Sequence, residues 1–207
     1  MAYNPVCNLR LGSGIMPFRK LRDAGVPICL GTDEACSDDS HNLWVSAKIA
    51  GMIHTLCDAD YTGWPTATEI LEAVWLGRAR AIRHPVGRLA PGYKADIALL
   101  ELTSDSVTPL NDLHRQLVYA ETGNSVRHTI VNGAVVVMNG VVTTLDEQAI
   151  KAELRRLAPK IRGYIAKLLS EAEALIPYYR EMYLKAMRTD VGMMRRLSDA
   201  DEEFGFG

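Results

Sequence analysis

The sequence predicts an α/β protein, and three observations support this class. A short apolar run at 26–30, bounded by Gly25 and Gly31, is typical of a buried strand in a parallel sheet. Segments with helical spacing flank that run, and such alternation of helix and strand favours a wound sheet or barrel. Farther along, Asn132-Gly133 between two β-rich runs indicates a hairpin. The second part of the chain therefore favours a small antiparallel β unit.

The first 85 residues contain the parallel part. Pro17 suits the first turn of a helix at 14–24, and Gly25 is placed to end it. Thr66 and Glu69 have the spacing of a capping box, in which each side chain bonds the other residue's amide. In chain order we expect a strand near 1–4, the helix at 14–24, a strand near 26–32 parallel to the first, a polar loop at 34–40, and helices at 41–57 and 66–80.

Residues 86–144 are the β unit, and residues 145–207 are predicted to be helices and a tail. From residue 145, apolar side chains recur every three or four positions, and Asp146 is a good N-cap. Pro159 and Pro177 are expected to break this region into separate helices. The β unit should hold strands at 95–102, 126–131, 134–138 and 141–144 with a helical or irregular stretch at 109–120, and the tail from 189 should be loose.

Composition excludes several classes of protein. The chain has 207 residues, of which 48% are hydrophobic and 23% charged, and a net charge of −2, which argues against a nucleic-acid binder. No apolar run reaches the ~18 residues of a membrane span. The first residues lack the basic and apolar regions of a signal peptide. The four cysteines (Cys7, Cys29, Cys36, Cys57) form no CxxC pair, so we expect a cytoplasmic protein.

Asp33 is the most informative candidate for chemistry. It is a carboxylate at the carboxyl end of a predicted strand, where active sites of parallel α/β proteins form. Alternatively, it caps the next segment. Asp38 and Asp39 could bind a metal or share a proton, but acids before a helix more often interact with its dipole. Ser37 either forms a hydrogen bond with Asp33 across the turn or serves only as a helix cap.

Other polar residues carry weaker signals. The five histidines show no HxH or HxxxH spacing and are read as surface or packing residues (His41, His54, His84, His114, His128). No partner is identifiable for a cysteine nucleophile. The Gly12-Ser13-Gly14 run lacks a full phosphate-loop fingerprint.

Four stretches, in matching order, resemble the amidohydrolase superfamily. Residues 3–15 (YNPVCNLRLGSGI) resemble the motif around barrel strand 7, and residues 25–33 (GVPICLGTD) resemble strand 8. Residues 87–97 (GRLAPGYKADI) resemble the return from the barrel into a small β-sandwich, and 126–140 resemble its closing hairpin. The similarity is to the branch of methylthioadenosine/S-adenosylhomocysteine deaminases, guanine deaminase-like enzymes and triazine hydrolases.

The resemblance implies the C-terminal portion of a TIM (β/α)8 barrel (strands 7 and 8 and the following helices), part of a β-sandwich, and C-terminal helices. It implies a metal-dependent hydrolase acting on a C–N bond of a purine-, pterin- or triazine-like ring, in which the metal activates water. Asp33 would be the catalytic aspartate that contacts the metal and carries the proton. Asn4, Asn8 and Ser37 would line or support the substrate pocket. The expected metal is zinc, with iron or manganese as alternatives.

The sequence also departs from that pattern. Tyr3 stands where the motif usually has His, Cys7 where it has Ser, and Glu34 where Gly is common. The metal-binding histidines of strands 1, 5 and 6 have no counterpart, and one carboxylate falls short of the roughly three protein ligands of a catalytic zinc. We therefore expect the back portion of a longer enzyme, which holds no metal and has no activity alone.

Two alternatives remain. The chain could be a non-catalytic interaction module or one half of a split enzyme, completed by a chain that carries the other strands. Open strand edges would invite such pairing, or pairing with another copy in a homo-oligomer. Otherwise, the chain is an unrelated α/β domain in which Gly31-Thr32-Asp33 is coincidental. No reading implies a nucleic-acid or membrane partner.

Overall fold

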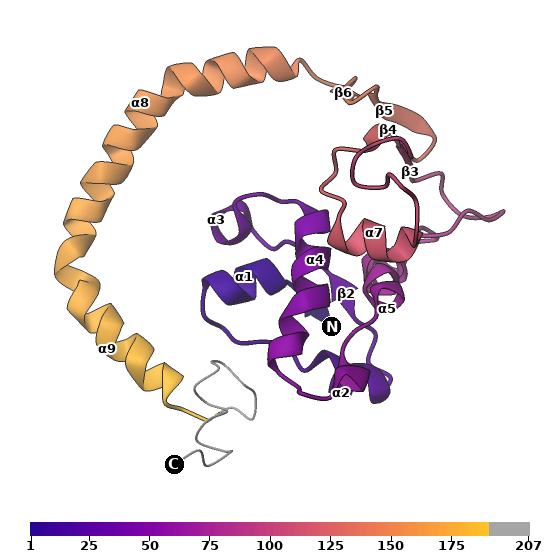
Figure 1. The fold of residues 1–207 in the computed structure, drawn as a ribbon. Coiled ribbons are helices and arrows are strands. Elements are labelled where there is room, and N and C mark those ends of the chain that lie inside the picture. The colour runs from indigo at the N-terminus through magenta and orange to yellow at the C-terminus, as the bar shows by residue number, and fades with distance from the viewer. Residues whose placement is uncertain (191–207) are drawn as a thin grey trace. The chain divides into compact units, whose positions relative to one another are not determined.

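The computed structural model describes residues 1–190. The chain divides into two compact units, whose described parts are residues 1–140 and 141–190 (Figure 1).

The first unit begins with the predicted pair of parallel strands. Strand β1 (Ala2–Tyr3) pairs with β2 (Cys29–Leu30), with Ala2 opposite Cys29 and Tyr3 opposite Leu30. Both strands are short. The helices of this part are α1 (Pro5–Arg10), α2 (Phe18–Asp23), α3 (Ala35–Asp38), α4 (Leu43–Ile53), α5 (Ala67–Glu72) and α6 (Arg78–Ile82).

Three of these elements differ from the predictions. Helix α1 was not predicted; Pro5 occupies its first turn, where the fixed φ of proline favours a helix. The helix expected at 14–24 begins only at Phe18, because Gly14 has a φ of +95° that no right-handed helix accommodates. The loop expected at 34–40 contains the single turn α3.

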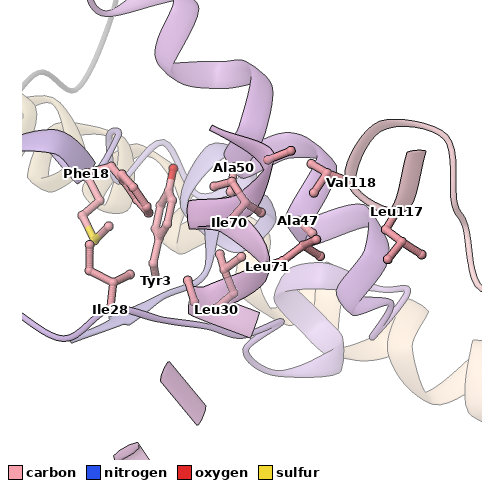
Figure 2. Close-up of a cluster of buried hydrophobic side chains, with 13 residues drawn as sticks. Tyr3, Phe18, Ile28, Leu30, Ala47, Ala50, Ile70, Leu71, Leu117 and Val118 are labelled. Atoms are coloured by element: carbon pink, nitrogen blue, oxygen red, sulfur yellow. The ribbon is translucent and has the colours of Figure 1, made fainter. Parts of the chain in front are cut away.

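Side chains from strands and helices distant in sequence form one hydrophobic core (Figure 2). Small residues on α4 allow it to approach the strands and α5 closely, and α7 (Leu113–Tyr119) packs against both helices. The central residues are Tyr3, Phe18, Ile28, Leu30, Ala47, Ala50, Ile70, Leu71, Leu117 and Val118. The core therefore joins the parallel strands to a helix from the second half of the unit.

The predicted helix at 66–80 is present and packs directly on β2. Its capping box is confirmed: Thr66 Oγ1 accepts from the Glu69 amide, and Glu69 accepts from the Thr66 amide. A π-helical segment (Ala73–Gly77) joins α5 to α6. A Cβ atom on Gly77 would lie 2.1 Å from the Ile28 carbonyl oxygen, so only glycine permits this contact.

Ion pairs between two arginines of α2 and two glutamates of α5 join these helices. Arg19 donates to both Glu69 carboxylate oxygens at 2.8 Å, and Arg22 contacts Glu69 at 2.9 Å and Glu72 at 2.7 Å. Burial opposes ionisation of Glu69, but the hydrogen bonds from Arg19 and the Thr66 amide outweigh it and lower its pKa to about 2.

An antiparallel sheet forms the rest of the first unit. Strand β3 (Ile97–Leu100) pairs with β4 (Val126–Val131), which pairs with β5 (Ala134–Met138). The predicted hairpin between β4 and β5 is confirmed. Asn132 and Gly133 have φ angles of +49° and +85°, the left-handed conformations that its turn requires.

The connection between β3 and β4 is organised around one buried carboxylate. Glu121 is 1% exposed and accepts from the Ser106 hydroxyl at 2.7 Å, from the Ser125 hydroxyl, and from the amides of Thr122 and Gly123. Burial disfavours its charge, yet these donors lower its pKa to about 2. The stretch predicted at 109–120 contains α7, which Asp112 caps.

The second unit contains β6 (Val141–Val142), α8 (Glu147–Ala172) and α9 (Ile176–Met187). Asp146 caps α8 as predicted, accepting from the Ala149 amide at 2.8 Å. The expected break at Pro159 is wrong, because that residue lies inside α8. Pro177 does stand in the first turn of α9, as expected. The predicted loose tail falls almost wholly outside the described residues, among which no helix is long and apolar enough to cross a membrane.

We predict that Gly77→Ala destabilises the first unit by about 3 kcal/mol, because the added methyl group overlaps the β2 backbone. Chemical denaturation followed by circular dichroism would measure the loss. Gly163→Ala is the control: a Cβ atom there meets nothing within 4 Å, so helix α8 should be unchanged or more stable. Equal stability of Gly77→Ala and the parent chain would contradict the proposed close contact.

Glu121→Gln should lower the free energy of unfolding by about 2 kcal/mol, because an amide cannot accept hydrogen bonds from all the buried donors. The folded-state pKa is depressed, so the carboxylate stabilises the fold above the unfolded-state pKa, and this contribution falls as pH drops from about 4.5 towards 2. Denaturation across that range would show a weaker acid dependence in the variant. Asp105→Asn, in the same connection, should change neither quantity.

Candidate active site

Asn4 lies beside the carboxyl end of β2 because the two short strands pair in parallel. The Gly31 amide donates to the Tyr3 carbonyl at 3.0 Å, which brings position 31 next to Asn4. A Cβ atom on Gly31 would lie 2.5 Å from Asn4 Oδ1, so glycine leaves room for the amide side chain. The register of the two strands thus places the Asn4 side chain next to the loop that follows β2.

Asp33 is held in that loop with its carboxylate exposed. Its Oδ2 accepts from Asn4 Nδ2 at 3.0 Å, and its Oδ1 accepts from the Glu34 amide at 2.8 Å. Its φ of +66° is in the left-handed region, which non-glycine residues seldom adopt. The N-cap of α3 is Glu34, so the capping role considered for Asp33 is wrong. Its backbone and side chain are instead both constrained at the strand end.

The pKa of Asp33 is lowered by three donors. The largest effect comes from the Cys7 thiol, followed by the Glu34 amide and the Asn4 side chain. Cys7 is buried on α1, one helical turn after Asn4, so the first turn of α1 presents both side chains to one carboxylate. The spacing of Asn4 and Cys7 was the signal for this pairing, which sequence reasoning missed. Asp33 is therefore ionised at neutral pH.

Two other predicted residues do not contact Asp33. Ser37 is buried, but its hydroxyl donates to the Glu34 carbonyl at 3.0 Å, so the considered bond to Asp33 is wrong. The turn of α3 places that carbonyl three residues before the serine. Asn8 is half-buried on α1, and its side chain forms no hydrogen bond with any residue in 1–190. The structure thus brings together Asn4 and Asp33, with Ser37 nearby in the loop.

The adjacent acids have separate local roles. Asp38 is 6% exposed, and its Oδ1 accepts from the Ser40 and His41 amides at 3.0 Å each. Asp39 pairs with Arg10 of α1. The ion pair joins the loop to α1, and the Asp38 contacts lie within the loop. Helix α4 is capped by Asn42, and the interaction of the two acids with a helix dipole stays a prediction.

Two exposed side chains next to Asp33 form their own pair. The Cys36 thiol donates to Glu34 Oε2 at 3.4 Å. This hydrogen bond, more than the slight loss of solvation, raises the pKa of the thiol. Cys36 is therefore a poor nucleophile at neutral pH, because the thiolate is the reactive form.

Beneath the site, Tyr3 and His54 form a buried polar contact. Tyr3 Oη lies 3.4 Å from His54 Nε2, and the Phe18 ring centroid lies 5.6 Å from the His54 ring centroid. Burial lowers the pKa of His54 to about 4 and raises that of Tyr3. Both side chains are neutral at neutral pH, which confirms the packing role predicted for this histidine.

The described residues do not fit a complete metal site. Within 1–190, no group of three or more His, Cys, Asp or Glu side chains could hold a metal ion. Asp33 is a single exposed carboxylate hydrogen-bonded to Asn4, whereas a catalytic zinc needs about three protein ligands. This part of the chain could contribute one ligand, and the others would have to come from elsewhere.

Comparison with known proteins identifies the family. The sequence profile of the amidohydrolase family matches residues 2–136, and the chain belongs to this family of enzymes. It is 35% identical over 158 residues to a 5'-deoxyadenosine deaminase of Methanococcoides burtonii, which is 76% of this chain and 36% of the relative. It is 36% identical over 173 residues to a 5-methylthioadenosine/S-adenosylhomocysteine deaminase of Natronomonas pharaonis, covering 84% and 38% of the two chains.

Solved structures show the same relationship. An adenosine deaminase from Xanthomonas campestris with bound zinc superposes with a TM-score of 0.74 at 27% identity, over 78% of this chain and 37% of that one. A zinc complex of atrazine chlorohydrolase from Arthrobacter aurescens gives 0.71 at 29% identity, over 75% and 35%. The α/β class and the link to TIM-barrel amidohydrolases are confirmed. The chain spans less than two-fifths of these proteins' length.

Asn4→Ala should raise the pKa of Asp33 towards its ordinary value, because the variant loses a donor that favours the charged carboxylate. Carbon-detected NMR titration of the Asp33 side chain would measure the change. Asn8→Ala, on the same segment but without a hydrogen bond to Asp33, should leave that pKa unchanged. A similar shift in both variants would mean that Asn4 does not act through its hydrogen bond.

Proposed function

We propose that this chain is the C-terminal portion of a hydrolase that deaminates a purine-like heterocycle. In this proposal β1 and β2 are the seventh and eighth strands of a (β/α)8 barrel, and residues 1–85 form the end of that barrel. Residues 86–144 contribute to a β-sandwich, and residues 145–207 supply C-terminal helices and a tail. The support is the family membership, the deaminase relatives, and an ionised aspartate held at the carboxyl end of β2.

Asp33 is the residue that carries the proposal. In hydrolytic deamination, water forms a C–O bond to a ring carbon, one water proton is removed, and the exocyclic amino group leaves as ammonia after gaining a proton. An exposed carboxylate that is ionised at neutral pH can accept the first proton and return it to the departing nitrogen. Asn4 and Cys7 would hold the carboxylate in position, and Asn8 and Ser37 would support the surrounding pocket.

The proposal also requires zinc ligands beyond those that the described residues supply. The family's solved structures include zinc complexes, but this chain offers Asp33 as a single candidate ligand within its described residues. We infer that the chain alone retains no zinc and is inactive, and that the remaining ligands come from further protein, either in the same chain or in a complementing one. The substrate class suggested by the relatives is a 5'-substituted adenosine, such as 5'-deoxyadenosine.

A chimera tests this function. We expect the purified chain to show neither stoichiometric zinc nor release of ammonia from 5'-deoxyadenosine. When the chain replaces the matched third of the Methanococcoides burtonii relative, turnover should appear. Asp33→Asn in the chimera should lower kcat about 10³-fold, because proton transfer is lost. Asp105→Asn is the matched control and should retain the parent kcat.

Two outcomes would contradict the proposal. Stoichiometric zinc together with turnover in the isolated chain would overturn the incomplete site. A folded Asp33→Asn chimera with unchanged kcat would overturn the role given to that carboxylate. Zinc analysis and circular dichroism of each variant would separate loss of catalysis from loss of metal or fold.

A further inference from the structure

The segment between Glu72 and Asp96 concentrates positive charge. It contains no acidic residue, although the whole chain has a net charge of −2. Its cations are Arg78, Arg80, Arg83, Arg88 and Lys94. A run of like charges of this kind creates a positive local potential, which attracts anions.

Three of these cations surround one open cavity. Arg80 and Arg83 come from the end of α6, and Arg88 comes from the turn that follows. The cavity has a volume of about 370 Å³, with Tyr93 on its wall and Leu76 and Val86 contributing apolar surface. Arginines and apolar residues therefore line the same space.

The three arginines have no acidic partner among residues 1–190. None of them forms an ion pair or a side-chain hydrogen bond there, whereas Arg19 and Arg22 are fully engaged by α5. The acid nearest in sequence, Glu72, is bonded to Arg22 at 2.7 Å. The helix dipole accounts for Arg80 in the last turn of α6 but not for Arg88 in the loop.

The backbone around the cavity is closed by specific contacts. The Lys94 amide donates to the Pro85 carbonyl at 2.8 Å, which joins the two ends of the turn. Gly87, with a φ of +81°, approaches Trp75 so closely that a Cβ atom would lie 2.7 Å from its carbonyl oxygen. Val86 is buried beneath the turn. The cavity is thus formed by a loop anchored to the helix.

This cavity lies away from Asp33. Arg80 and Leu76 also line a neighbouring cavity that is lined in addition by Gly25–Ile28, the residues directly before β2. Asp33 follows the other end of the same strand. The basic cavity is therefore at the amino end of β2, opposite the candidate active site.

We propose that this basic cavity binds a phosphate monoester with an apolar or aromatic body. Guanidinium groups match phosphate oxygens in geometry and charge, and two or three of them can hold one dianion. The volume exceeds that of a phosphate ion, and Tyr93 and Leu76 offer a surface for the remainder of the ligand. The proposal is independent of the deaminase function, because it uses no residue of the Asp33 site.

Isothermal titration of the full chain at constant ionic strength tests this binding. The probes are phenyl phosphate and inorganic phosphate. We expect saturable binding that is tighter for phenyl phosphate. Arg83→Gln and Arg88→Gln should each weaken it about tenfold, since each removes a charge-assisted donor pair. The control is Arg115→Gln, which removes the same charge from an exposed site outside the cavity and should leave affinity unchanged.

The outcomes are distinct. Equal affinity for the two probes, lost in the cavity variants, would support the anion site and identify free phosphate rather than an ester as its ligand. Absence of saturable binding of either probe would overturn the proposal. Equal weakening by Arg115→Gln would also overturn it, because binding would then reflect net charge alone. Circular dichroism would verify that each variant is folded.

Discussion

The parallel pairing of two very short strands is the constraint on which the first unit depends. Two backbone hydrogen bonds, from Cys29 to Met1 and from Gly31 to Tyr3, set the register. Tyr3 ends β1, and Asn4 follows it directly as the N-cap of α1. The register therefore buries Tyr3 against His54 while it turns Asn4 towards Asp33. A shift by one residue would exchange these environments and disrupt the core and the candidate site together.

Two glutamates with little exposure stabilise other parts of the unit by different means. Glu69 joins α2 to α5, and Glu121 organises the connection between β3 and β4. Glu69 is held by guanidinium groups, whereas Glu121 is held by hydroxyl and amide donors. Each has a pKa of about 2 despite the cost of burial. Salt screens interactions between partly exposed charges far more than hydrogen bonds to neutral buried donors. High ionic strength should therefore loosen the contact between α2 and α5 before it affects the connection around Glu121.

The features that could be predicted from sequence are those determined by neighbouring residues. The Asn132-Gly133 turn, the Thr66 capping box and the Asp146 cap each depend on side chains within a few positions. The predictions were wrong, or were missed, where the structure depends on more than the neighbouring residues. Pro159 has no amide hydrogen and so removes one helical hydrogen bond, yet α8 continues through it from Glu147 to Ala172. The fit of Gly77 against Ile28 joins residues far apart in sequence, and no local pattern predicts it.

The same distinction applies to function. Asp33 could be proposed as a site residue because a carboxylate at a strand end is a local pattern, while its hydrogen-bond partners Asn4 and Cys7 depend on the pairing of distant strands. That pairing also gives β2 two chemically different ends. Asp33 and Glu34 make the carboxyl end acidic, and the arginines around Arg80 make the amino end basic. An anion would be repelled from the first end and attracted to the second, so a phosphate ligand and a neutral heterocycle need not compete for one position.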